Sequence, residues 1–232
     1  MSEPATSLTF TVHIGGKQGA ETIAIRHAVI AGWTGRDQAA VEHHIAELEK
    51  LGVPRPASVP IFYRVAASRF TTATRIEVPG NESSGEVEFA LVQHAGRLYV
   101  GVGSDHTERK VETYNVTVSK QMCEKPIAPV LWAYDDVKTH WDRLVLRSWA
   151  CGGASRTLYQ EGPVAAMRDP EELIRRYTDG RGLADGTAMF CGTLTAIGGI
   201  RPAPRFEFEL EDPVRDLRIR HGYDIAVLPV MG

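Results

Sequence analysis

The sequence predicts an α+β domain that is mainly β. Short segments of alternating apolar and polar residues, separated by Gly, Asn and Pro, fill the middle of the chain, which is typical of strands joined by turns. Only three segments look helical. The 232 residues, 43% of them hydrophobic, are enough for one substantial core. We expect one structural unit, with an N-terminal β-hairpin segment (1–36) packed on a main domain (37–232).

The first 52 residues contain a predicted hairpin and the strongest helix. Residues 8–13 alternate and end at a Gly-Gly turn, and a second strand over 22–28 would complete the hairpin. Asp37 is a suitable cap for a helix whose apolar residues recur at three- and four-residue intervals as far as Gly52.

The remaining segments are mostly strands. Patterns of strand type are listed next: 61–65, 76–78, 86–93, 97–102, 111–118, 187–194 and 206–210. Residues 135–149 look helical, and so do residues 169–177, where Asp169-Pro170 supplies a cap and a proline at the first helical position. Residues 149–162 are expected to form a loop that selects the substrate.

Composition argues against several classes of partner. With 26 Lys and Arg against 29 Asp and Glu, the net charge is −3, so we expect no nucleic-acid partner. No apolar run approaches the roughly 20 residues of a membrane helix, so we expect no membrane partner. Three widely spaced cysteines suit neither a disulfide framework nor a zinc motif, and the N-terminus has no secretory pattern. We therefore expect a cytoplasmic protein.

Two acidic residues begin one predicted strand. Glu86 and Glu88 are two residues apart, so their side chains point to the same face of a sheet, and the polar stretch 103–109 offers a third carboxylate, Asp105. Carboxylates that share a face repel one another unless a cation lies between them, and a hard divalent ion suits oxygen ligands. An ordinary solvated strand face and a polar surface turn are the alternatives.

Other residues are candidates for acid–base chemistry. His44 and Glu47 lie three apart on the predicted helix, and a carboxylate beside an imidazole raises its basicity, as a general base requires. The neighbouring His43 also fits a solvated helix face. Lys120 closes the predicted strand 111–118, where a surface lysine is the alternative. His106 is a second candidate for ligand or base.

Read in order, these motifs resemble the fumarylacetoacetate hydrolase superfamily from about residue 40 to about residue 212. His44-x-x-Glu47 and the proline-rich residues 51–64 are similar to the family's helix, turn and Pro-x-x-Phe-x-Lys strand. Residues 86–92 resemble its Glu-x-Glu-Leu-Ala strand, and residues 105–109 its Asp-x-Ser-x-Arg motif. Ser119-Lys120 resembles its Gly-Lys-Ser segment, and residues 185–193 its Gly-Asp and Gly-Thr-Pro stretch.

The sequence departs from the family at several points. Arg64 stands where lysine is usual, Ser104 where asparagine precedes the aspartate, and Leu194 where proline follows Gly-Thr. The gap from Glu88 to Asp105 is shorter than in the family, as if a helix were missing. We expect a divergent bacterial branch with a substrate of its own.

The resemblance implies a fold, a cofactor and a reaction. The fold is a compact mixed β-roll with a few flanking helices, and the catalytic domain spans residues 37–232. A Mg²⁺ ion, or Mn²⁺ or Ca²⁺, is held by Glu86, Glu88 and Asp105 and stabilises an enolate when a carbon–carbon bond of a 1,3-dicarbonyl or acylpyruvate-type 2-oxo acid is hydrolysed. The protein is expected to be a homodimer.

The resemblance also assigns the remaining roles. His44 and Glu47 activate water and Lys120 stabilises the oxyanion, while the expected substrate contacts are Arg64, Arg109, Gly192 and Thr193. The same site would suit a 2-oxo acid decarboxylase or a hydratase or isomerase, and an organic-acid-binding protein without catalysis is the non-enzymatic alternative.

Overall fold

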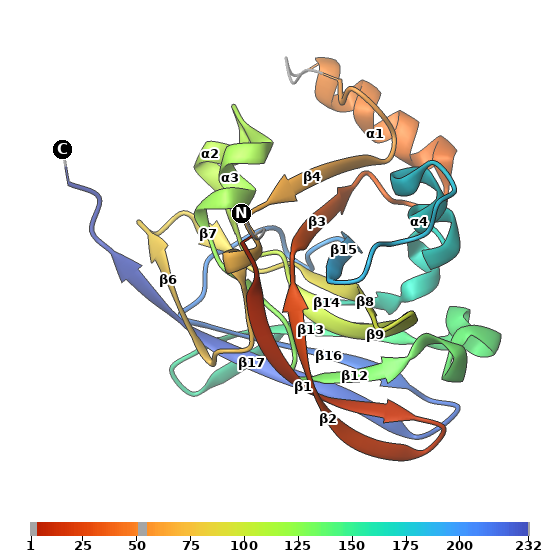
Figure 1. The fold of residues 1–232 in the computed structure, drawn as a ribbon. Helices are drawn as coiled ribbons and strands as arrows, with labels where there is room; N and C mark the ends of the chain where they lie inside the picture. The colour runs from red at the N-terminus through yellow and green to blue at the C-terminus, as the bar shows by residue number, and fades with distance from the viewer. Residues whose placement is uncertain (1–3, 51–54, 232) are drawn as a thin grey trace.

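The computed structural model describes residues 4–50 and 55–231, except for the side chains of His44 and Leu48, and its body is built from two β-sheets (Figure 1). The larger sheet has the strand order β2-β1-β12-β9-β8-β15-β3-β4, and the smaller has the order β14-β13-β16-β17-β6. The strands of the larger sheet are β1 (Thr6–Ile14), β2 (Lys17–Ile25), β3 (His27–Gly32), β4 (Ile61–Val65), β8 (Val87–His94), β9 (Arg97–Ser104), β12 (Val130–Ala133) and β15 (Thr187–Thr193).

Five further strands form the smaller sheet, which includes the blue C-terminal strand in Figure 1. These strands are β6 (Arg75–Pro79), β13 (Val145–Gly152), β14 (Ser155–Pro163), β16 (Arg205–Asp212) and β17 (Leu217–Leu228). Two short pairs complete the β-structure: β7 (Ser83–Ser84) with β10 (Thr107–Glu108), and β5 (Phe70–Thr71) with β11 (Lys125–Pro126).

Helices are short and flank the sheets. The α-helices are α1 (Gln38–Lys50), α2 (Arg109–Glu112), α3 (Val116–Met122) and α4 (Pro170–Thr178), and the single-turn or distorted 3₁₀ helices are Ala67–Arg69, Tyr134–Asp136, Lys138–Arg143 and Val164–Ala166. The predicted α+β, mainly β class is confirmed. No helix in the described ranges is long and apolar enough to cross a membrane.

The N-terminal strands are part of the larger sheet. The β1–β2 hairpin is confirmed, β1 pairs in parallel with β12, and β3 pairs in parallel with β15. The first strands therefore complete the sheet that carries the candidate site, and the domain boundary at residue 36 stays a prediction.

Two hydrophobic clusters cover the two faces of β8. Val87, Phe89 and Leu91 belong to the core between the sheets, whereas Ala90 and Val92 belong to a second cluster on the other face. Because side chains alternate along a strand, Glu88 shares the second face with Ala90 and Val92. A strand buried on both faces explains the nearly continuous apolar sequence after Glu88.

Local capping signals predicted two helices correctly. The Asp37 carboxylate accepts hydrogen bonds from the backbone N–H groups of residues 39 and 40, both at 3.0 Å, and α1 begins at the next residue. The Asp169 carboxylate accepts from Glu171 N at 2.8 Å at the start of α4. The predicted end of the first helix at Gly52 lies outside the described residues.

Three predicted elements are wrong. Residues 111–118, expected as a strand, lie in α2 and α3, because the side chains of Glu108 and Asn115 cap these helices by accepting from Val111 N and Val118 N. Lys120 consequently lies on α3. Residues 135–149, expected as a helix, form 3₁₀ turns and the start of β13, and the expected loop 149–162 is the β13–β14 hairpin.

Candidate metal centre

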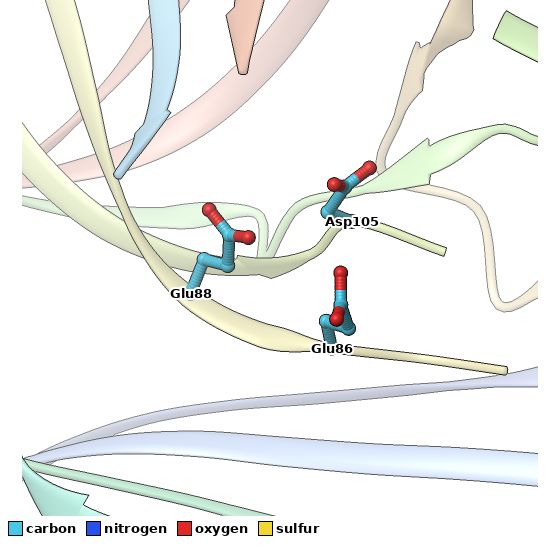
Figure 2. A group of neighbouring side chains, drawn as sticks. All are labelled: Glu86, Glu88 and Asp105. Atoms are coloured by element: carbon cyan, nitrogen blue, oxygen red, sulfur yellow. The ribbon is translucent and has the colours of Figure 1, made fainter. Parts of the chain in front are cut away.

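Three carboxylates converge where β8 begins and β9 ends. Glu86 directly precedes β8, Glu88 is its second residue, and Asp105 directly follows β9 (Figure 2). One oxygen atom of each lies within 4.8 Å of the others. The antiparallel register pairs Val87 with Ser104, so one hairpin brings the three together. No intervening helix is needed for the short gap between Glu88 and Asp105.

Two of these carboxylates are almost completely buried. The exposed fraction is 2% for Glu88 and 0% for Asp105, whereas the Glu86 side chain is 17% exposed. Burial of a carboxylate favours its neutral form unless cations or hydrogen bonds stabilise the charge. The surrounding cations therefore decide the state of the site.

Lys120 and Arg109 supply positive charge beside Glu86. Lys120 Nζ, on α3, forms an ion pair with Asp105 Oδ2 and lies 3.9 Å from Glu86 Oε2. Arg109 Nη1 lies 3.2 Å from Glu86 Oε1 and 2.8 Å from Glu112 Oε2. Burial lowers the pKa of Lys120, but the carboxylates outweigh it and raise that pKa above its usual value. Lys120 is therefore a cation and not a proton acceptor.

Sequence reasoning missed a second lysine at the site, Lys125. Its side chain is fully buried, and Nζ lies 3.0 Å from Asp105 Oδ1 and donates to the carbonyl oxygen of His106 at 2.6 Å. Burial would raise the pKa of Asp105, but Lys120 and Lys125 outweigh it and lower that pKa to about 2. Burial lowers the pKa of Lys125 itself. A lone lysine before a proline carries no sequence signal of burial.

Glu88 is held by a backbone group. Its Oε2 accepts a hydrogen bond from Gly192 N at 2.6 Å, so Gly192, a residue expected to contact substrate, also positions a carboxylate of the site. Burial first, and then the charges of Asp105 and Glu86, raise the pKa of Glu88 well above its usual value. Gly192 has φ = +98°, and a Cβ there would lie 1.7 Å from Thr34 Oγ1, so the position requires glycine.

The donor set fits a hard divalent cation. Three carboxylates supply oxygen atoms, which Mg²⁺ and Ca²⁺ prefer, within a span that one ion can bridge. The carboxylates of Glu86, Asp105 and Glu112 form ion pairs with the cations Lys120, Lys125 and Arg109. A divalent ion would offset both the burial and the repulsion that raise the pKa of Glu88.

Of the side chains expected to bind substrate, Arg109 contacts Glu86 and Thr193 lies opposite Glu88 on the neighbouring strand, whereas Arg64 lies apart from them. Thr193 Oγ1 donates to Val87 O at 2.8 Å and accepts from Gln160 Nε2 at 2.7 Å. Arg64 is exposed, and its guanidinium lies 3.2 Å from His27 Nδ1 and 3.4 Å from the Tyr177 hydroxyl. The structure therefore gives Arg64 contacts outside the carboxylate group.

The residue before Arg64 lies closer to the site. Lys120 Nζ lies 5.9 Å from the centre of the Tyr63 ring. Neighbouring strand residues point to opposite faces, so Tyr63 rather than Arg64 faces the lysine. The alternation of side-chain direction along β4 is the sequence signal that places Tyr63 and Arg64 on opposite faces.

The predicted His44–Glu47 pair stays a prediction. The side chain of His44 lies outside the described part of the structure. Glu47 is exposed on α1, and its Oε1 lies 3.3 Å from His43 Nε2 in an i,i+4 pair.

His106 is a buried structural residue rather than a ligand in this arrangement. Its Nδ1 lies 2.8 Å from the Tyr223 hydroxyl and its Nε2 2.9 Å from Ser83 Oγ, so both ring nitrogens have partners. Burial, Lys125 and Arg109 lower its pKa to about 3, which keeps the ring neutral.

Two surface cavities are lined by residues other than the three carboxylates. One, of about 620 Å³, is lined by Ser58, Val59, Pro60, Phe62, Arg175, Arg176, Asp179 and Gly180. The other, of about 300 Å³, is lined by Gly80, Asn81, Ser83, Pro202, Ala203, Pro204, Ile225 and Val227. None of these residues belongs to the carboxylate group.

A family model described as "Protein of unknown function (DUF2848)" matches residues 31–223. The chain belongs to this family. A comparison of the DUF2848 chain with curated proteins found no match.

Solved structures show the fold of the DUF2848 chain. Yeast ynq8, a fumarylacetoacetate hydrolase family protein, has a TM-score of 0.64 at 16% identity, over 90% of this chain and 96% of that chain. 2-Keto-3-deoxy-D-arabinonate dehydratase complexed with magnesium and 2,5-dioxopentanoate has a TM-score of 0.60 at 16% identity, over 88% of this chain and 74% of that chain. 4-Oxalocrotonate decarboxylase from Pseudomonas putida G7, complexed with calcium and acetate, has a TM-score of 0.54 at 12% identity, over 87% of this chain and 77% of that chain. The DUF2848 chain has the fumarylacetoacetate hydrolase fold, so the resemblance is confirmed at this level.

Proposed function

We propose that this protein is a divalent-metal-dependent hydrolase that cleaves a carbon–carbon bond in a 1,3-dicarbonyl or acylpyruvate-type 2-oxo acid. The observation that carries the proposal is the convergence of Glu86 with the buried Glu88 and Asp105 beside Lys120, which forms an ion pair with Asp105. Removing the charge of a carboxylate from water costs free energy, so a group of buried carboxylates that does not stabilise the fold is rare. Their grouping therefore favours a functional site.

Structures of the same fold support the metal and the substrate class. The arabinonate dehydratase was solved with magnesium and a dioxo acid, and the oxalocrotonate decarboxylase with calcium and acetate. Both pairs combine a hard divalent ion with a carboxylate ligand. We transfer to this chain the shared chemistry, metal-dependent processing of a 2-oxo acid, and propose Mg²⁺ as the ion with Mn²⁺ or Ca²⁺ as alternatives.

The carboxylates would hold the cation, and the cation would supply Lewis-acid stabilisation of developing enolate charge. Glu86, Glu88 and Asp105 provide the oxygen ligands. Gly192 N orients Glu88 through its 2.6 Å hydrogen bond, and Lys125 orients Asp105. Preorganised ligands of this kind need no rearrangement when charge develops.

The chain's own residues would move the protons and stabilise the charge. In the hydrolysis, a water oxygen adds to the distal carbonyl carbon, the carbon–carbon bond breaks, and the leaving carbon takes up a proton, giving a carboxylate and a shorter 2-oxo acid. We propose His44, oriented by Glu47, as the base that accepts the proton of water. Lys120 stays protonated and stabilises the oxyanion.

Dehydration and decarboxylation are the second candidate reactions. The observation that favours them is the dehydratase and decarboxylase activity in the names of two proteins with this fold. All three reactions develop negative charge beside the carbonyl groups, so the same site would serve each of them. The homodimer implied by the resemblance stays a prediction, which sedimentation would test.

Product analysis tests the proposal. The chelator-treated protein is assayed with Mg²⁺ against acylpyruvates and other 2-oxo acids, and the products are identified by mass spectrometry. Hydrolysis gives two carbon fragments, decarboxylation gives carbon dioxide, and dehydration gives the loss of one water. We expect Mg²⁺-dependent hydrolysis that is lost in Glu88→Gln and kept in Asp135→Asn, a variant of an exposed carboxylate. Mg²⁺-independent turnover, or equal activity of Glu88→Gln, would contradict the proposal.

A further inference from the structure

A tyrosine of the smaller sheet reaches the segment that carries Asp105. Tyr223 lies on β17, is fully buried, and packs its ring against Phe206 and Phe208 with centroid distances of 5.9 and 6.3 Å. Its hydroxyl lies 2.8 Å from both Ser104 Oγ and His106 Nδ1. These are the residues immediately before and after Asp105, so one hydroxyl holds both neighbours of a carboxylate residue of the site.

The same hydrogen bonds extend to Glu86. Ser104 Oγ accepts from Glu86 N at 3.2 Å, and Asp105 N donates to Glu86 O at 3.0 Å. Ser104 is therefore the link between the Tyr223 hydroxyl and the backbone of Glu86. All of these groups except Glu86 are buried, so no bulk water replaces a lost partner at little cost.

We infer that Tyr223 is a positioning residue of the metal centre. Its hydroxyl fixes residues 104–106 against residue 86, which sets the spacing between the carboxylates of Asp105 and Glu86. The inference rests on the proposed metal-dependent function. Groups that hold metal ligands in place typically change metal affinity by 10–100-fold when they are removed, although they never touch the ion.

If Tyr223 only stabilised the core, its removal would have a different effect. A second buried tyrosine serves as the control that distinguishes this role from a positioning role. Tyr159 on β14 is also buried and packs edge-on against Phe206 at 5.7 Å. Its hydroxyl accepts from Arg201 N at 3.3 Å, away from the carboxylates. If the Tyr223 hydroxyl only stabilises the core, Tyr223→Phe and Tyr159→Phe both lower the melting temperature and neither changes metal affinity.

Calorimetric titration of the full chain tests the inference. Chelator-treated wild type, Tyr223→Phe and Tyr159→Phe are titrated with Mg²⁺ and Mn²⁺, and their folding is checked by circular dichroism. We expect 10–100-fold weaker binding in Tyr223→Phe and binding within 2-fold of wild type in Tyr159→Phe. Wild-type affinity in a folded Tyr223→Phe would overturn the inference while leaving the proposed function intact.

A second variant covers the case in which Tyr223→Phe does not fold. Ser104→Ala removes the other end of the link, and we expect it to weaken metal binding by a similar factor. The effects of two folded single variants should not add in the double variant, because both break the same connection. Unchanged metal affinity in Ser104→Ala would overturn the inference, and a wild-type protein that binds no metal would overturn the proposed function together with it.

Discussion

Replacing Lys125 with methionine should lower the free energy of unfolding far more than the same replacement of an exposed lysine. Methionine keeps most of the side-chain volume and removes the charge. Asp105 then keeps Lys120 as its cation but loses the partner 3.0 Å from Oδ1, and the His106 carbonyl loses its 2.6 Å hydrogen bond. The perturbation therefore isolates the cost of leaving buried polar groups without a partner.

The magnitude follows from the burial of the pair. Removing one partner of a buried ion pair costs about 3–5 kcal/mol. Burial already lowers the pKa of Lys125, so removing this lysine also removes an unfavourable desolvation, and we expect about 3 kcal/mol, at the lower end. For a chain of this size, that free energy corresponds to a fall of about 6–12 °C in melting temperature.

Urea denaturation in the presence of chelator measures this loss without a contribution from bound metal. The matched control is Lys138→Met, because the Lys138–Asp135 pair is exposed and should leave the denaturation midpoint unchanged. The dependence of the protein's stability on pH below about 4 gives a second readout. The lowered pKa of Asp105 stabilises the protein above about pH 4, and this stability is lost as the pH falls toward 2. In Lys125→Met the pKa of Asp105 rises, so this acid-side loss of stability should be smaller and should end at a higher pH. A midpoint equal to that of Lys138→Met would refute the reasoning.

Three further predictions test neighbouring parts of the site. Gly192→Ala should cost at least about 1–3 kcal/mol of folding free energy because of steric overlap, whereas Gly199→Ala, with positive φ but nothing within 4 Å, should cost less; thermal melting compares them, and equal losses would count against the overlap. His44→Ala should lower turnover by about 10²–10⁴-fold with metal affinity unchanged, whereas His43→Ala should keep turnover; full activity of His44→Ala would move the base elsewhere. Metal affinity should weaken as the pH falls, because the raised pKa of Glu88 lets protons compete at a higher pH than at an ordinary glutamate; calorimetry from pH 5 to 8 measures this, and a flat profile would contradict it.

Sequence reasoning succeeded where the determining signal is local. Asp37 and Asp169 cap the helices that follow them, and the two-residue spacing of Glu86 and Glu88 places both on one face of the hairpin. The order of the motifs then predicted the fold. Asp105 joined the group because a hairpin needs only its register to bring residues 17 apart together.

Sequence reasoning failed where strand propensity was weighed above a local cap, and where the packing of distant strands decides what surrounds the site. Val111, Val116 and Val118 favour a strand by propensity, but the caps at Glu108 and Asn115 begin helices there. Lys125 on β11 reaches Asp105, and Tyr223 on β17 reaches the flanking residues Ser104 and His106; no local pattern shows that these strands pack beside the site.

Divalent-cation binding by the full chain is the measurement that tests the central claim most directly. Chelator-treated wild type and the Glu86→Ala/Glu88→Ala double variant are titrated with Mg²⁺ and Mn²⁺ in a calorimeter. The carboxylate site predicts specific one-site binding in the wild type that is lost in a folded double variant. Equal binding by the two proteins, or no binding by the wild type, would contradict it.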